Sequence, residues 1–198
     1  FPFLMGHYAT DTYNIYNLGY KEFAITNSFK DGRMFTGIAV LIAHVTNVPI
    51  KISVSIMLFI ALVISNIIVI IIKNIVEKYK PAKNIKQQII ITSMSYITVF
   101  NFMYLDNLYF WECGIMALSV LLYVLSANIL VEKNSKYFLK SMILTILGVM
   151  CYQGTIGLFF TYVLLFSILK NKENIKSIVR DFAQCIIIAV ISIAVELI

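Results

Sequence analysis

Long apolar runs separated by short lysine-rich segments constrain the fold of this chain more than any other feature. A helix needs about 20 apolar residues to cross the hydrocarbon core of a bilayer, and residues 52–72 form such a run without a charged side chain. Hydrophobic residues make up 60% of the chain, whereas soluble domains contain roughly 45–50% apolar residues. The sequence therefore predicts an all-α fold, a polytopic transmembrane helix bundle.

Basic residues are concentrated in the segments that connect the apolar runs. Three connections hold most of the Lys and Arg residues, namely Lys73, Lys78, Lys80, Lys83 and Lys86, then Lys133, Lys136 and Lys140, then Lys170, Lys172, Lys176 and Arg180. Cytoplasmic loops of membrane proteins carry such an excess. We therefore read the net charge of +6 as a signal of topology and expect no nucleic-acid partner.

The pattern divides one transmembrane domain, residues 1–198, into segments. Since the chain lacks an initial Met and ends within an apolar run, we expect it to be a fragment of a longer protein. Residues 1–33 are predicted to be an outer loop, and residues 34–50 a helix at the membrane interface. The remaining predictions are spans at 52–72, 88–105 and 113–131, a helical hairpin at 141–169 that turns at Tyr152, and the start of a further span at 182–198.

Polar and charged side chains are predicted to gather on the outer face. They are Asp11, Asp31, Arg33, Asp106, Glu112, Tyr152 and Gln153. A carboxylate near lipid can serve as general base for an acceptor hydroxyl, because burial raises its pKa. An arginine beside it can hold a phosphate through paired hydrogen bonds. This combination suits chemistry on a phosphate-bearing donor and a hydroxyl acceptor.

Each of these residues also has a simpler interpretation. Asp11 can be a helix cap, and Asp31 and Arg33 can belong to a turn. We interpret Asp106 and Glu112 as solvated loop charges. Tyr109, Phe110 and Trp111 are predicted to be interfacial anchors, and Tyr152 and Gln153 can join helices by hydrogen bonds.

Common motifs of cofactor and metal sites are missing from the sequence. Cys113, Cys151 and Cys185 are scattered and form no CxxC or Cys/His cluster. No glycine-rich phosphate loop, HExxH or GxSxG motif occurs. We predict no resident metal site and no cofactor, and the sequence leaves open a divalent cation shared by acids and phosphates.

The order of these features resembles a known family. An Asp in the first outer loop (Asp11, within His7–Asp11) is followed by Gly19, by Gly32 and Arg33, and then by a helix near Pro49. Tyr152 and Gln153 follow late, within the hydrophobic hairpin. In this order the chain is similar to the N-terminal part of the bacterial Gtr type-two glucosyltransferases, multi-pass enzymes of the GT-C class.

The resemblance implies a function and roles for individual residues. The expected donor is a polyprenyl-phosphate-linked sugar, and the expected acceptor is a cell-surface glycan or glycolipid outside the bacterial plasma membrane. Asp11 would be the catalytic base, with Asp31 in reserve because Thr10, rather than a second acid, precedes Asp11. Arg33 would bind the phosphate. The other expected substrate contacts are His7, Tyr8, Tyr152 and Gln153.

A different class of function remains open from the sequence. Discontinuous helices build the binding sites of many transporters, and the predicted break at Tyr152 would fit a transporter or flippase-like carrier for a lipid-linked sugar. Ion-coupled carriers usually place charged residues within their spans, but residues 52–72 and 113–131 contain none at mid-span. This absence favours the glycosyltransferase. In both interpretations membrane lipids surround the protein.

Overall fold

The computed structural model describes residues 10–101, 107–172 and 174–196, which are almost entirely helical. No strand occurs in these ranges, so the predicted all-α class is confirmed. In the N-terminal half the helices are α1 (Thr10–Leu18), α2 (Tyr20–Phe23), the π-helical turn η2 (Ala24–Ser28), α3 (Met34–Val45), α4 (Ile50–Tyr79) and α5 (Ile85–Val99). They are followed by α7 (Cys113–Glu132), α8 (Tyr137–Cys151), the 3-10 turn η3 (Gln153–Thr155), α9 (Ile156–Asn171) and α10 (Ile175–Glu196).

Four of the described helices are long and apolar enough to cross a membrane. These are α4, α7, α10 and the continuous stretch Gln153–Asn171 formed by η3 and α9. The longest is α4, whose 30 residues extend about 45 Å at 1.5 Å per residue. It follows Pro49 and ends two residues before Pro81, positions where proline is compatible with a helix boundary. A bilayer core is about 30 Å thick, so α4 is longer than one crossing requires.

Helix ends differ from the segment boundaries expected from the sequence. Residues 1–33, expected as a loop, contain α1, α2 and η2 among their described residues. Within the predicted hairpin, α8 ends at Cys151 and η3 starts at Gln153. The two arms, α8 and α9, pack mainly on α7 and α10 and contact each other little. The two arms of the hairpin are therefore held by α7 and α10 and not by each other.

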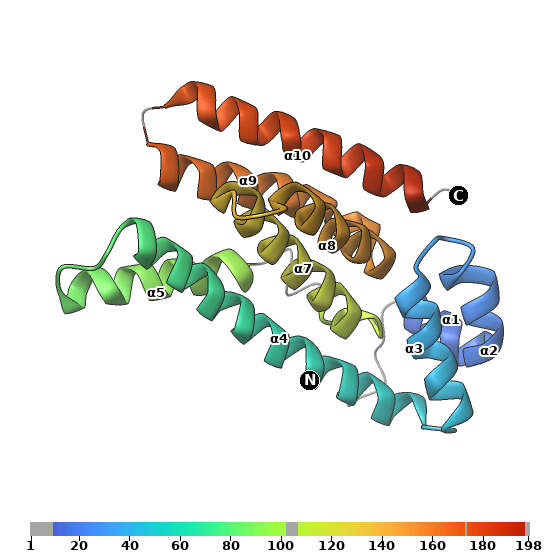
Figure 1. The fold of residues 1–198 in the computed structure, drawn as a ribbon. Coiled ribbons are helices and arrows are strands. Elements are labelled where there is room, and N and C mark those ends of the chain that lie inside the picture. Colours follow the sequence, from blue (N-terminus) through green and yellow to red (C-terminus); the bar gives the residue numbers. More distant parts are fainter. Residues whose placement is uncertain (1–9, 102–106, 173, 197–198) are drawn as a thin grey trace.

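The most enclosed helix is α7, which packs against α4, α8 and α9 (Figure 1). Small residues on its buried face allow close approach of the neighbouring helices. Gly114 lies against α4, where an added Cβ would meet the Met57 carbonyl oxygen at 3.1 Å. Tyr123 fills the space beside Gly148 of α8, where an added Cβ would meet its ring at 2.7 Å. Both glycines thus bring α7 close to a partner helix.

Basic connections lie at one end of the bundle. Lys78 near the end of α4 pairs with Glu132 at 2.7 Å, and Lys133, directly after α7, pairs with Asp181 of α10 at 2.5 Å. Lys170 of α9 donates to the Val131 carbonyl oxygen in the same region. In Figure 1 these connections lie toward the left, whereas α1–α3 and the C-terminal end of α10 lie on the right. The bundle therefore has a lysine-rich end and an opposite end built around α1–α3.

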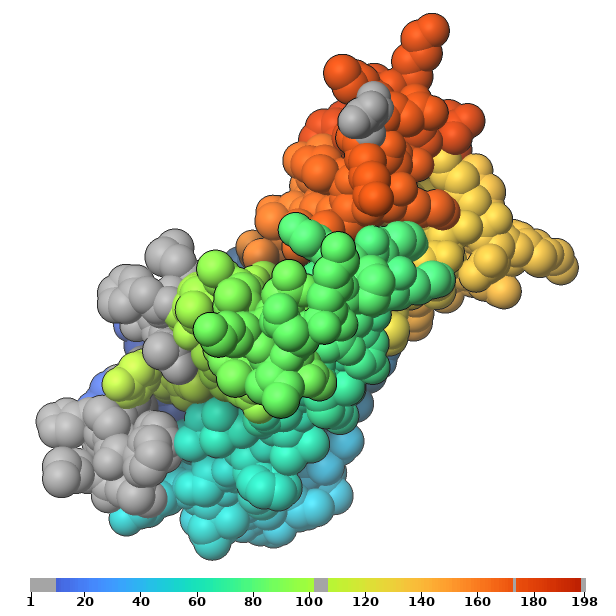
Figure 2. Space-filling view, turned by 90° about the vertical axis from the view of Figure 1, so that its left-hand side faces the viewer, coloured from blue at the N-terminus to red at the C-terminus, as the bar shows by residue number. Residues whose placement is uncertain are grey.

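One helix lies on the outside of the bundle. Figure 2 shows α5 in front, with α4 beside it and α9 and α10 above. Large apolar side chains on α5 are exposed, among them Ile85, Ile89, Met94 and Ile97. Such a surface is compatible with a lipid environment.

Candidate functional site

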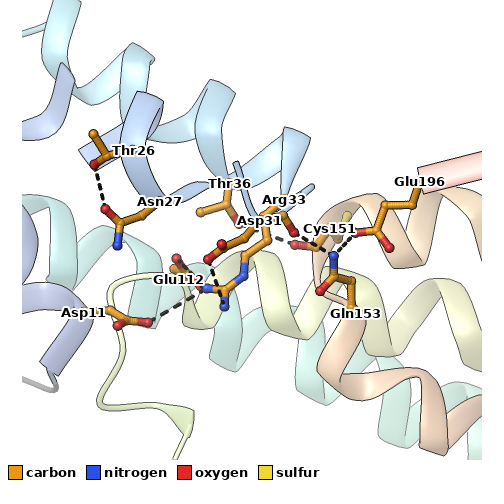
Figure 3. Close-up of polar contacts among 10 residues, drawn as sticks. All are labelled: Asp11, Thr26, Asn27, Asp31, Arg33, Thr36, Glu112, Cys151, Gln153 and Glu196. Atoms are coloured by element: carbon orange, nitrogen blue, oxygen red, sulfur yellow. Dashed lines mark hydrogen bonds and ion pairs between the residues drawn. The ribbon is translucent and has the colours of Figure 1, made fainter. Parts of the chain in front are cut away.

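Arg33 lies at the centre of a charged cluster at the end of the bundle opposite the lysine-rich end (Figure 3). Its Nη1 donates to both carboxylate oxygens of Glu112, at 3.0 and 3.3 Å. Asp11 Oδ2 lies 3.9 Å from the same nitrogen, and Asp31 Oδ2 lies 3.8 Å from Nη2. One guanidinium therefore faces three carboxylates, of which those of Asp11 and Glu112 are distant from Arg33 in the chain.

The backbone around Gly32 explains how Arg33 reaches this position. The helix that contains η2 ends in a Schellman motif, with Arg33 N–H donating to the Ser28 carbonyl oxygen and Gly32 N–H to that of Phe29. Gly32 has a φ of +74°, a left-handed conformation that favours glycine. α3 begins at Met34. Arg33 is thus fixed between η2 and α3.

Glu112 is positioned by the residue before it. Trp111 is buried, its backbone N–H donates to Thr12 Oγ1 at 3.0 Å, and its indole N–H donates to Ser53 Oγ at 2.8 Å. The Ser53 hydroxyl also bonds to the hydroxyl of Tyr20 at 2.6 Å. Because Thr12 is one residue from Asp11, the same contacts that hold Glu112 also hold α1 against the start of α7.

Burial changes the acidity of Glu112. Its side chain is 0% exposed, compared with 32% for Asp11 and 49% for Asp31. Desolvation raises the pKa of Glu112 to about 7, opposed by the charge of Arg33 and reinforced by Asp11 and Asp31. This carboxyl therefore changes protonation near neutral pH.

Tyr152 and Gln153, in the turn between α8 and α9, contact the cluster. The Arg33 guanidinium carbon lies 5.2 Å from the centre of the Tyr152 ring, within the range of a cation–π interaction. Burial raises the pKa of Tyr152, so it remains a neutral phenol near pH 7. Gln153 Nε2 donates to the Asp31 carbonyl oxygen at 2.6 Å and contacts the carboxylate of Glu196. The hairpin turn thereby contacts both the arginine and the turn that carries it.

Of the outer-face residues selected from the sequence, Asp11, Asp31, Arg33, Glu112, Tyr152 and Gln153 all lie in this cluster. The other candidates, His7, Tyr8 and Asp106, lie outside the described residues. Within the described ranges, no group of three or more His, Cys, Asp or Glu side chains is placed to hold a metal ion.

Two sequence interpretations are wrong in this region. Glu112, expected to be a solvated loop charge, is fully buried against Arg33. Trp111, expected to be an interfacial anchor, is buried and hydrogen-bonded inside the protein. A signal was present in the sequence, because Glu112 is an acid directly before an apolar span with no Lys or Arg nearby in the chain. Such an acid needs a cation from elsewhere in the fold when it is buried.

The carboxylates of this cluster can orient a hydroxyl and accept its proton, and the Arg33 guanidinium can donate hydrogen bonds to an anion. The cluster lies at one end of a bundle whose four long helices are apolar enough to cross a membrane. This combination is typical of a membrane protein with a polar site at the membrane surface. The family model described as "Glucosyl transferase GtrII" matches residues 1–198, and the chain belongs to that family. Membership supports glucosyl transfer and therefore implies a sugar donor and an acceptor. No curated protein and no solved structure matches the chain.

Proposed function

We propose that the protein transfers a glucosyl residue from a polyprenyl-phosphate-linked sugar to a cell-surface glycan or glycolipid. The observation that carries the proposal is the placement of Asp11 and Asp31 on either side of Arg33, at 3.9 and 3.8 Å. Transfer from such a donor needs a base for the acceptor hydroxyl and a cation for the departing phosphate. Both kinds of group meet here.

Asp11 is the proposed base. Its side chain is partly exposed at the start of α1, so a hydroxyl group can approach it from outside the cluster. As the acceptor oxygen attacks the anomeric carbon, the hydroxyl proton passes to the Asp11 carboxylate. The bonding pair of the breaking carbon–oxygen bond leaves with the polyprenyl phosphate. Asp31, which is more exposed, is the alternative base.

Arg33 is the proposed phosphate-binding group. Glu112 engages Nη1 closely, whereas Asp31 lies 3.8 Å from Nη2, beyond a normal hydrogen bond. Nη2 can therefore donate to a phosphate oxygen. Tyr152 packs over the guanidinium and supports its orientation. Tyr152 and Gln153, which contact Arg33 and the turn before it, are the other proposed substrate contacts.

The proposed location is the bacterial plasma membrane, with the Arg33 cluster facing outward. This orientation rests on the lysine-rich connections at the other end of the bundle, which favour the cytoplasm. A lipid-linked donor would then enter laterally from the bilayer. The fold is proposed to be of the GT-C type, following the order of the sequence features.

The test is a transfer assay with the full-length protein in membranes, supplied with radiolabelled polyprenyl-phosphate glucose. Wild type is compared at matched expression with Asp11→Asn and Asp31→Asn. Glu22→Gln is the control, because Glu22 is an exposed acid on the neighbouring helix α2. We expect Asp11→Asn to lower transfer by at least about 100-fold, within the range contributed by general base catalysis, and Glu22→Gln to retain it.

The other outcomes distinguish the alternatives. Loss of transfer in Asp31→Asn alone would assign the base to Asp31. Equal transfer by all variants would exclude both acids as the base. If no variant transfers label, and wild type moves the lipid-linked sugar across the membrane, the carrier function replaces the enzyme.

A further inference from the structure

The charge of the Arg33 cluster conflicts with binding of an anion. Three carboxylates face one guanidinium, so the cluster carries a net charge of −2 when all of them are ionised. Within the described part of the chain, no second Lys or Arg pairs with these acids. A phosphodiester, itself an anion, would be repelled by the two uncompensated charges. Donor binding therefore requires a change in the cluster.

Glu112 is the member of the cluster best placed to lose its charge. It is fully enclosed, whereas Asp11 and Asp31 remain in contact with solvent. The groups that face it are Arg33 at the start of α3, Asp11 on α1, Asp31 in the preceding turn and Tyr152 beyond α8. Of these only Arg33 stabilises its negative charge. When a phosphate shares the Arg33 charge, that stabilisation weakens and the pKa of Glu112, already about 7, rises further.

We propose that Glu112 takes up one proton when the donor phosphate binds to Arg33, so that donor binding and protonation of Glu112 are linked. The inference rests on the proposed function, since it assumes that Arg33 holds the phosphate. The proton comes from solvent on binding and returns to solvent when the phosphate departs. Glu112 is a positioning residue, because it acts through Arg33 and touches no reacting atom.

Linkage of this kind has a defined dependence on pH. A ligand whose binding adds one proton binds most tightly where Glu112 is already protonated, below pH 7. Above pH 7 its dissociation constant rises by about tenfold per pH unit, until the pKa of the ligand-bound state is passed. In Glu112→Gln a neutral amide replaces the carboxyl, so no proton is taken up at this position and the dissociation constant no longer depends on pH.

The experiment measures binding of methyl farnesyl phosphate to the full-length protein in lipid nanodiscs. This diester carries a single negative charge that does not titrate between pH 5.5 and 9, so any slope belongs to the protein. Titration calorimetry in buffers of different ionisation enthalpy counts the protons taken up. For wild type at pH 8 we expect uptake approaching one proton, and for Glu112→Gln uptake near zero with affinity independent of pH.

Two further variants separate this inference from the proposed function. Asp31→Asn removes another carboxylate from the same guanidinium, and should tighten binding while leaving the dissociation constant dependent on pH. Arg33→Gln should abolish binding. Binding that needs Arg33 but is independent of pH, or a slope that persists in Glu112→Gln, would overturn the linkage and leave the proposed function intact. Absence of binding to wild type at any pH would overturn both.

Discussion

Glu112 lies fully buried beside Arg33, which makes the stability of the folded protein depend on pH. Its pKa is raised from 4.5 to about 7 by folding. Below pH 4.5 the carboxyl is protonated in both states and has no effect on the balance. As pH rises from 4.5 to 7, the unfolded chain releases the proton and the folded protein retains it, so folding loses stability. The loss is complete above pH 7.

Glu112→Gln is therefore expected to stabilise the protein at pH 8, by on the order of a few kcal/mol. The amide can still accept from Arg33, and Asp11 and Asp31 still balance the guanidinium charge. Thermal unfolding in detergent at pH 5 and pH 8 measures the effect, with Glu22→Gln as control. Equal midpoints for wild type and Glu112→Gln at pH 8 would contradict the burial of a titrating acid.

Individual residues show what the sequence could predict of the site. Asp11, Asp31 and Arg33 are polar groups in an otherwise apolar chain, and a polar side chain kept near a membrane is conspicuous by itself. The sequence interpretation of Glu112 and Trp111 is wrong because charged and aromatic residues between spans usually face water or the interface. Only tertiary packing, through Thr12 and Ser53, turns this segment inward.

The C-terminal end of α7 joins the neighbouring helices through two adjacent residues. Glu132 pairs with Lys78 of α4, and Lys133 pairs with Asp181 of α10. The Asp181 carboxylate is buried and also accepts from Ser167 and Asn171 of α9. This end of α7 therefore connects three helices through charged groups.

Lys133→Met should destabilise the protein by about 3–5 kcal/mol, because it leaves the Asp181 carboxylate buried without a cation. Lys136→Met is a matched control, since Lys136 lies in the same connection, also has a positive φ and is exposed. Denaturation in detergent compares the variants. Adding Asp181→Asn to Lys133→Met should recover much of the loss, and an additive loss in the double variant would argue against the pairing.

The elements were predictable to the extent that they are long and apolar. α4 and α7 contain long, mostly apolar runs without a charged residue, which no soluble element requires at such length. α1, α2 and η2 are short and carry polar residues without a clear helical period, so local pattern gives little signal. They form helices here because Ile15 and Phe23 are buried in a cluster with Val40 and Trp111.

At the scale of the whole molecule, the two ends of the helix bundle carry different charged groups. Acidic groups and Arg33 occupy the end formed by α1–α3, and the lysine-rich connections occupy the other. The positive-inside tendency then sets an orientation that thiol labelling can measure. The native cysteines Cys113, Cys151 and Cys185 are buried and give a low background.

We expect Tyr16→Cys to react with an impermeant maleimide in intact spheroplasts, and Lys136→Cys to react only after the membrane is opened. Tyr16 is exposed on α1 near the Arg33 cluster, and Lys136 is exposed in the α7–α8 connection. Labelling of both from one side would contradict placement of the two ends on opposite faces. Labelling of Lys136→Cys alone in intact spheroplasts would show that the Arg33 cluster faces the cytoplasm. Asp11 would then meet acceptors there, and transfer to a surface glycan would have to precede its export.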